Sequence, residues 1–250
     1  MTSIQYDHVA DLYDFYVPYE IDIPFFIEEA TAVSGNVIEL MAGTGRVSIP
    51  LVQADVSLTC VDASEKMLAA LNQKLQNAKL SATILQADVR NFTIENSFEL
   101  AILPFHSFSE LITSDDQLAA LNSIYNCLTK GGHFICTLHN PALRLKSADG
   151  CLRLNGHFQY ENGTLCISGF ENYDKRKHVV NRMQFYELYD DQGILRSKRF
   201  LEMQFCPIEK LEFETLANKV GFKTVAFYGD YSRSEFKADS SPYMIWVLEK

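Results

Sequence analysis

The chain has 250 residues, of which 47% are hydrophobic and 22% charged, so it can bury a sizeable core, as one α/β domain with an insertion or as two small lobes. Its formal net charge of -10 and its pI near 5.1 argue against nucleic acid and anionic lipid as partners, because both require clustered Lys and Arg side chains. The six cysteines show no spacing typical of a disulfide framework or a zinc site. No apolar run reaches the roughly 20 residues of a membrane span, and the N-terminus lacks signal-peptide features. We therefore expect a cytoplasmic protein without a metal and without a membrane partner.

Strand and helix patterns alternate through the first 140 residues, which is typical of a mostly parallel sheet with helices on both faces. The predicted strands cover residues 36–41, 57–62, 82–86, 98–103 and 132–139. The predicted helices between them cover residues 46–54, 64–77 and 115–128. Ser64 can cap the second helix, and Ser114 with Gln117 can form a capping box at the third.

After Pro141 the hydrophobic pattern changes to a period of two, which is typical of antiparallel strands. The β-rich stretches are residues 164–174, 178–190 and 194–206. A helix near 208–220 ends at Gly221, and strands near 222–229 and 242–249 follow. The pattern predicts a core of residues 1–140 and 207–250, with residues 141–206 forming an inserted antiparallel sheet that covers the site.

The junction between the first strand and the first helix is the most informative stretch. Gly43 and Gly45 let the backbone adopt positive φ and approach a ligand, while the N–H groups that open the helix stay free to donate. Asp62 closes the second strand, where a carboxylate can accept hydrogen bonds from ribose hydroxyls. These features predict a nucleoside cofactor. Ser48 occupies the third glycine position of the dinucleotide fingerprint, and no Gly-Lys-Ser or Gly-Lys-Thr of a P-loop follows the turn.

Four motifs occur in the order found in class I S-adenosylmethionine-dependent methyltransferases. They are Glu39-Leu-Met-Ala-Gly-Thr-Gly-Arg46, Val61-Asp62-Ala-Ser-Glu-Lys-Met67, Gln86-Ala-Asp88-Val89 and Leu128-Thr-Lys-Gly-Gly-His-Phe134. The chain resembles this family over most of its first 140 residues. The resemblance implies S-adenosyl-L-methionine as the cofactor and a Rossmann-like, seven-stranded, mostly parallel sheet whose last strand is antiparallel.

The resemblance also implies a cofactor site built from several segments. The residues assigned to it are Tyr6, Met41, Ala42, Gly43, Thr44, Gly45, Asp62, Ala63, Met67, Asp88, Val89, Leu103, Pro104 and Phe105. Asp62 would hold the ribose hydroxyls, and Asp88 with Val89 would meet the adenine edge. Tyr6 would close over the cofactor carboxylate, or it would pack on the core as part of an amphipathic helix. Met41 stands where the family most often has glycine.

The segment after the fourth strand lies at the carboxyl end of the sheet, where ligands bind in such folds. By the resemblance, Pro104 and Phe105 would flank the methyl group. His106 is the candidate catalytic base, since an unperturbed imidazole has a pKa near 6.5. Its alternatives are a cap on the next helix or a position facing solvent. A base is needed only if the acceptor arrives protonated.

Three further residues are candidates for the acceptor site: Phe108, His139 and Tyr231. For each, an ordinary structural role is the alternative. The inserted sheet and the C-terminal stretch resemble amino-sugar N-methyltransferases and, more loosely, glycine N-methyltransferase. This implies transfer to nitrogen or oxygen of a small-molecule acceptor by in-line displacement, with a homodimer left open. An NAD(P)-linked oxidoreductase and a non-catalytic S-adenosylmethionine-binding module remain the alternative functions.

Overall fold

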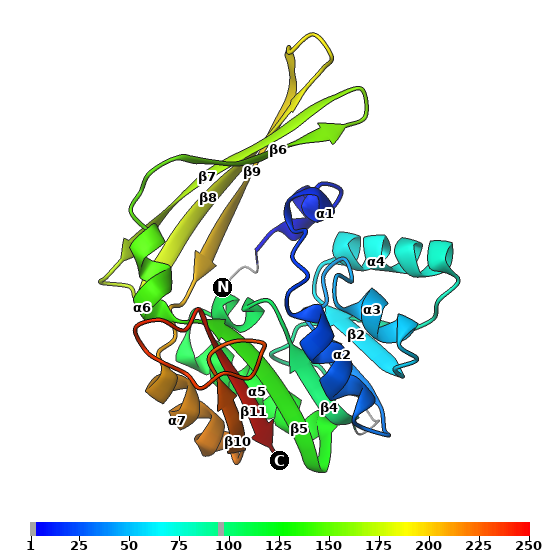
Figure 1. The fold of residues 1–250 in the computed structure, drawn as a ribbon, viewed down its shortest axis with the longest axis vertical. Helices are drawn as coiled ribbons and strands as arrows, with labels where there is room; N and C mark the ends of the chain where they lie inside the picture. Colours follow the sequence, from blue (N-terminus) through cyan, green and yellow to red (C-terminus); the bar gives the residue numbers. More distant parts are fainter. Residues whose placement is uncertain (1–3, 95–97) are drawn as a thin grey trace.

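The carboxyl ends of parallel strands meet along one edge of a seven-stranded sheet, with strand order β10-β11-β5-β4-β1-β2-β3. The computed structural model describes residues 4–94 and 98–250 (Figure 1). The strands are β1 (Val37–Leu40), β2 (Leu58–Asp62), β3 (Thr83–Gln86), β4 (Phe98–Leu103), β5 (Leu128–His139), β10 (Lys223–Tyr228) and β11 (Tyr243–Glu249). Strand β11 is antiparallel to both neighbours, whereas β1 to β5 pair in parallel. The predicted Rossmann-like sheet with an antiparallel last strand is therefore confirmed.

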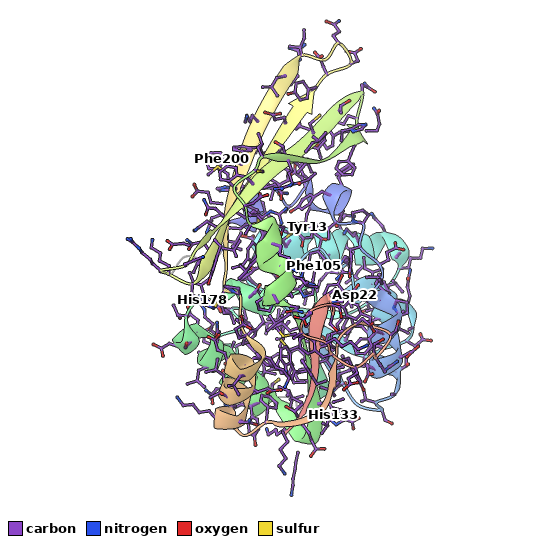
Figure 2. The ribbon with its side chains drawn as sticks, turned by 60° about the vertical axis from the view of Figure 1, so that its left-hand side comes forward. Tyr13, Asp22, Phe105, His133, His178 and Phe200 are labelled. Atoms are coloured by element: carbon purple, nitrogen blue, oxygen red, sulfur yellow. The ribbon has the colours of Figure 1, made fainter. Side chains whose placement is uncertain are left out.

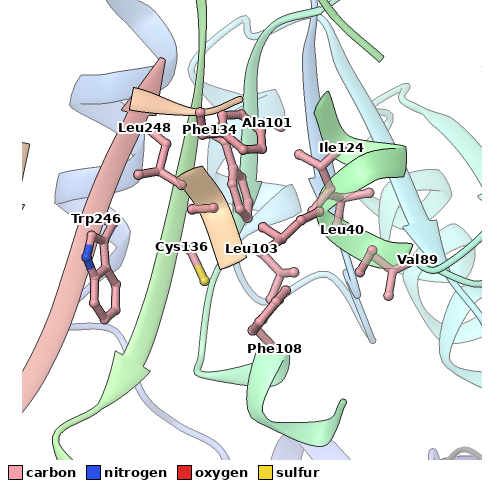
Figure 3. Close-up of a cluster of buried hydrophobic side chains, with 14 of the residues drawn as sticks. Leu40, Val89, Ala101, Leu103, Phe108, Ile124, Phe134, Cys136, Trp246 and Leu248 are labelled. Carbon is pink, nitrogen blue, oxygen red and sulfur yellow. The ribbon is translucent and has the colours of Figure 1, made fainter. Parts of the chain in front are cut away.

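Helices cover both faces of this sheet (Figure 1). The helices packed on one face are α2 (Ile23–Thr31), α3 (Ser48–Gln53) and α4 (Glu65–Ala78), and those on the other are α5 (Ser114–Cys127) and α7 (Lys210–Val220). Alternate residues of β1 serve the two layers: Val37 packs in the cluster with α2 to α4, and Leu40 in the cluster with α5 and α7. Figure 3 shows the second cluster, in which Leu40, Phe134 and Trp246 are fully buried.

Two local predictions need correction. The cap of α5 is Thr113 rather than Ser114, because Thr113 keeps an extended backbone and its hydroxyl accepts the N–H of Asp116 at 3.1 Å. Strand β5 begins at Leu128 rather than near residue 132, because a register shift between Phe98 and Leu100 lets the pairing with β4 continue past Gly131. The predicted cap Ser64 is confirmed, since its hydroxyl accepts the N–H of Met67.

A second, four-stranded antiparallel sheet stands away from the first (Figure 1). Its strands are β6 (Arg153–Tyr160), β7 (Gly163–Asp174), β8 (Val179–Tyr189) and β9 (Leu195–Phe205). Three of them were predicted; β6 was missed because it is mostly exposed and so carries little apolar alternation. The inner face packs Ile167, Tyr186 and Leu201 against Val9 and Leu12. The division of the chain into a core and an insertion of residues 141–206 stays a prediction.

The N-terminal segment lies between the two sheets (Figure 1). It holds two short helices, η1 (Tyr6–His8) and α1 (Tyr13–Tyr16), instead of one amphipathic helix. The other short elements are η2 (Ser107–Glu110), α6 (Pro141–Arg144) and η3 (Leu145–Ser147). Within the described residues, no helix has both the length and the hydrophobicity needed to cross a membrane.

An ion pair joins the N-terminal segment to the turn that follows β1. The Arg46 Nη1 and Nη2 atoms donate to Asp22 Oδ1 and Oδ2 at 2.5 and 2.7 Å, and the Asp22 side chain is fully buried. Arg46 also donates to the Tyr19 carbonyl at 2.6 Å. A charge left in this position without its partner is costly, so both residues hold the segment in place together.

We expect Asp22→Ala to lower the free energy of unfolding by about 3 to 5 kcal/mol, because Arg46 would keep a desolvated charge without a counterion. The double variant Asp22→Ala/Arg46→Met should be less destabilised than the sum of the two single variants. Urea denaturation of the four proteins measures this coupling. Additive losses would show that the pair makes no specific contribution.

Candidate active site

The turn after β1 has an unusual backbone. Met41, Gly43 and Gly45 have φ values of 56°, 57° and 85°. A Cβ on Gly43 would meet no atom of the described residues within 4 Å, so this glycine leaves open space beside the backbone. A Cβ on Gly45 would come within 2.2 Å of the Leu71 side chain, so Gly45 is required by the packing of α4. Met41 accepts the left-handed conformation that glycine adopts more easily.

Asp62 ties this turn to the start of α4. Its Oδ2 accepts the Gly43 N–H at 2.8 Å, and its Oδ1 accepts the Ser64 N–H at 2.8 Å. Burial raises the pKa of Asp62, and these two hydrogen bonds oppose the rise. A carboxylate offers about four lone-pair sites, so Asp62 can still accept a hydrogen bond from a ligand.

A cavity of about 1160 Å³ opens above this turn. The predicted cofactor residues that line it are Tyr6, Met41, Gly43, Asp62, Ala63, Met67, Asp88 and Val89. The other predicted cofactor residues do not line this cavity. Ala42 and Thr44 are buried within the turn, and Leu103 and Pro104 are buried at the end of β4. The structure thus brings the ends of β1, β2 and β3 together, as the sequence indicated.

Arg90 was not identified from the sequence. Its Nε donates to Asp88 Oδ1 at 2.9 Å, and its Nη1 donates to Asp116 at 2.9 Å. The Arg90 hydrogen bonds hold the pKa of Asp88 below its usual value. Asp88 is therefore oriented by Arg90 at the cavity wall. The signal for this pair was local, since an arginine follows the acid by two positions after β3.

A second cavity, of about 380 Å³, adjoins the first. The residues that line both are Tyr6, Tyr13, Ser107, Glu110, Arg182 and Met203. Aromatic side chains form much of the smaller cavity: Tyr6, Tyr13, Tyr16, Tyr19, Phe105 and Tyr243. The predicted residues Phe105, His106 and His139 line it as well. In Figure 2, Tyr13 and Phe105 lie between the second sheet and the core.

His106 is buried in the wall of the smaller cavity. Its ring stacks on His139, with ring centroids 3.6 Å apart, and on Tyr243 at 5.1 Å. The Nδ1 atom has no hydrogen-bond partner among the described residues. Burial, helped by nearby His139 and Arg144, holds the pKa of His106 well below 6.5, and burial lowers the pKa of His139 to about 3. Both rings are therefore neutral at pH 7.

Glu110, at the end of η2, is a site residue that the sequence analysis missed. The Tyr6 hydroxyl donates to Glu110 Oε1 at 3.0 Å. Burial, with a smaller effect of the Asp62 charge, raises the pKa of Glu110 to about 8, although the Tyr6 hydrogen bond acts against this. The only signal in the sequence was an acid in the stretch that follows β4, four positions after His106.

Two predicted acceptor residues lie outside the smaller cavity. Phe108 is fully buried and packs edge to face on Phe213 at 5.3 Å, within the cluster of Figure 3. The prediction that Phe108 lines the acceptor pocket is therefore wrong, because the tight turn of η2 directs this side chain into the core. Tyr231 packs between Phe25 and Tyr243, so it stands behind the cavity wall.

The N-terminal segment is fastened to the same turn. Asp14 accepts the Thr44 hydroxyl at 2.6 Å, and Asp7 accepts the Ser64 hydroxyl at 2.5 Å. Tyr6 lines both cavities and also packs edge to face on Tyr13 at 5.9 Å. The two alternatives given for Tyr6 are therefore compatible, since one face of the ring packs while the residue still borders the site.

Glu39 lies beneath the turn and is 1% exposed. The Ser48 hydroxyl donates to Glu39 Oε2 at 2.5 Å. Ser48, which replaces the third glycine of the dinucleotide fingerprint, therefore hydrogen-bonds this buried carboxyl. Burial raises the pKa of Glu39 from 4.5 to about 8. The native state therefore holds a proton that the unfolded chain releases near pH 4.5. The stability that this proton confers is complete below that pH and is lost as pH rises through 8.

We expect Glu39→Gln to raise the melting temperature, relative to the natural protein, more at pH 9 than at pH 6, because glutamine avoids the cost of ionising a buried carboxyl. Thermal unfolding of the ligand-free proteins at both pH values measures the difference. The matched control is Glu65→Gln, since Glu65 is exposed at the start of α4. An equal difference at both pH values would show that Glu39 does not change its protonation state between pH 6 and pH 9.

The chain also matches known proteins. The family model of the methyltransferase domain matches residues 37–132, which include the turn, Asp62 and Asp88. The YqeM protein of Bacillus subtilis (strain 168) is 25% identical over 94% of this chain and 93% of that protein. The glycine/sarcosine N-methyltransferase of Halorhodospira halochloris is 27% identical over 90% of this chain and 80% of that enzyme.

A solved structure shares the whole fold. The S-adenosylmethionine-dependent methyltransferase from Clostridium acetobutylicum ATCC 824 superposes with a TM-score of 0.80 at 17% identity, covering 96% of this chain and 95% of that one. The strand order of the sheet, the glycine turn after β1 and the match to the methyltransferase domain all indicate the same family. The chain belongs to the class I S-adenosylmethionine-dependent methyltransferases, and its cofactor is S-adenosyl-L-methionine.

Proposed function

We propose that the protein methylates the nitrogen of a small amine bound in the 380 Å³ cavity. The observation that carries this proposal is the contact between the two cavities, which share Tyr6, Tyr13 and Glu110 in their walls. A donor above the turn and an acceptor among the aromatic rings would then meet at these residues. The Halorhodospira halochloris relative, an N-methyltransferase by name, supports nitrogen as the acceptor atom.

The residues of the larger cavity fit the cofactor. Gly43 leaves room beside its backbone, and Asp62 offers free lone pairs at the end of β2, where a ribose would lie. Ala63 and Met67 present apolar surface for a nucleobase, and Asp88 offers an acceptor for an amino group. When bound, S-adenosylmethionine supplies an electrophilic methyl group on a positively charged sulfur.

The smaller cavity suits a small amine. Its volume lies at the lower end of the roughly 300 to 1,000 Å³ of ligand pockets, which fits a small molecule rather than a macromolecule. Its tyrosine and phenylalanine rings attract a cationic nitrogen through their π-electron faces. Holding the amine among these side chains fixes its direction and excludes water, and orientation of this kind supplies much of the rate of a displacement.

His106 has a role in this proposal that is compatible with its neutral state. The unpaired Nδ1 atom is buried, so the imidazole would have to turn toward the cavity that it lines in order to accept a hydrogen bond from the amine and fix its direction. The stacked His139 ring and Tyr243 hold the imidazole in place. His106 therefore serves better as an orienting hydrogen-bond acceptor than as a strong base.

We expect Asp62→Ala to weaken binding of S-adenosylmethionine and of its demethylated product at least 10-fold, about 1.4 kcal/mol, because the ribose acceptor and the Gly43 tether are both lost. Calorimetric titration measures the two affinities. The exposed Asp239→Ala is the matched control, and its affinities should stay unchanged. Binding to Asp62→Ala within twofold of the natural protein would exclude the ribose role.

The acceptor class is tested by a screen with S-adenosylmethionine as donor. Small primary and secondary amines, and the corresponding alcohols, are assayed for the demethylated cofactor and for a methylated product by mass spectrometry. We expect methylated amines and unchanged alcohols. Methylated alcohols would overturn the choice of nitrogen. Cofactor binding without any product would favour a non-catalytic binding module.

A further inference from the structure

Glu110 is a carboxyl group at the junction of the two cavities, and it has no cationic partner among the residues that the structure describes. It lines both cavities, and the Tyr6 hydroxyl donates a hydrogen bond to its Oε1. Among the described residues it forms no ion pair, whereas Arg144 and Arg182 in the same wall both pair with Glu171. A poorly hydrated carboxylate is stabilised strongly by a countercharge, and here a ligand has to supply it.

We propose that Glu110 recognises the ammonium form of the acceptor and takes one proton from it. This inference rests on the proposed N-methylation. In the step, an N–H bond of the ammonium breaks, its electron pair stays on nitrogen, and the proton forms an O–H bond with the Glu110 carboxylate. The products are a neutral amine and a neutral carboxylic acid. The amine then has the free lone pair that accepting a methyl group requires.

The groups that line the cavities with Glu110 favour this role. Tyr6 and Tyr13 come from the N-terminal segment, Asp62 from β2, His106 from the turn before η2, and His139 and Arg182 from β5 and β8. The two histidines are neutral, and Arg182 is bound to Glu171 at 3.3 Å. These neighbours leave room for one additional positive charge beside Glu110.

The relative basicities of Glu110 and His106 decide between the two candidate bases. An alkylammonium has a pKa of about 10, as for lysine. Glu110, with a pKa raised to about 8 by burial, would receive its proton against a gap of about two units, or ~100-fold. His106, with a pKa well below 6.5, would face a gap of more than about three units. Burial thus makes the carboxyl the stronger base of the two.

Tyr6 is a positioning residue in this arrangement. Its hydroxyl occupies one oxygen of Glu110 and leaves Oε2 available to the ammonium group. Because Tyr6 also borders the cofactor cavity, it holds the carboxyl at the point where donor and acceptor would meet. Loss of this hydrogen bond should disturb the orientation of Glu110 without removing its charge.

The test compares binding of benzylammonium with that of its uncharged counterpart, benzyl alcohol. Calorimetry at pH 8.5, where Glu110 is largely ionised in the natural protein, is run with the demethylated cofactor present. We expect the natural protein to prefer benzylammonium at least 10-fold. Glu110→Gln should abolish that preference and leave the affinity for benzyl alcohol within about twofold. Tyr6→Phe, which keeps the charge, should retain most of the preference.

A kinetic measurement separates the proton transfer from simple binding. With an amine identified in the acceptor screen, the acidic limb of the kcat/KM profile should shift toward the pKa of the free ammonium in Glu110→Gln, which must bind the neutral amine, and should stay below that pKa in Glu110→Asp. If Glu110→Gln does not fold, as judged by its melting temperature, Glu110→Asp and Tyr6→Phe still test the proposal. Both variants should still bind benzylammonium more tightly than benzyl alcohol.

Three results would overturn the inference. They are a natural protein with no preference for benzylammonium, a Glu110→Gln variant that keeps the preference, and an unchanged acidic limb in that variant. Each leaves the N-methyltransferase proposal standing if amines are still methylated in the screen. Methylation of alcohols alone, or of no acceptor, would instead remove the proposed function itself.

Discussion

The site depends on the hydrogen bonds that the Asp62 carboxylate accepts from the backbone. Because β1 and β2 are parallel neighbours, their carboxyl ends lie side by side, and Asp62 joins them by accepting the N–H groups of Gly43 and Ser64. The open space at Gly43 is thereby fixed relative to the start of α4. The N-terminal segment accepts hydrogen bonds from the hydroxyls of Thr44 and Ser64. It is therefore attached to the same two segments that Asp62 joins, the turn after β1 and the start of α4.

Burial changes the chemistry of the side chains that line the junction. It weakens His106 as a base and strengthens Glu110 as one, since an apolar surrounding disfavours the charged form of each. The choice of base from the sequence used the unperturbed pKa of imidazole, which is the right scale only in water. In the proposed proton transfer, burial reverses that choice. The aromatic walls therefore affect proton transfer as well as binding.

The sequence predicted most of the fold because its signals there are local. Alternating strand and helix patterns, two turn glycines and Asp62 specify the parallel core, and the sheet order confirms it. The side-chain directions within η2 are set by packing instead. Phe108 points into the core while Glu110, two positions later, reaches the cavities, and no periodic pattern covers a turn of four residues. Arg90 lies two positions after Asp88, which is a local signal, but its second contact, with Asp116 in α5, depends on how the fold packs.

The second sheet can vary the acceptor site without disturbing the cofactor turn. Cross-strand pairing places Glu171 opposite Arg182, and Arg182 opposite Met203, so charge and apolar surface reach the cavity in one row. Phe200 lies three positions before Met203 on β9, so its side chain points to the opposite face of the sheet. It is 57% exposed (Figure 2). A register slip of one residue would exchange these faces and destroy the cavity wall. Substitution within the row, by contrast, leaves the turn, Asp62 and Gly43 in place, because these belong to the other sheet, although Arg182 and Met203 border both cavities.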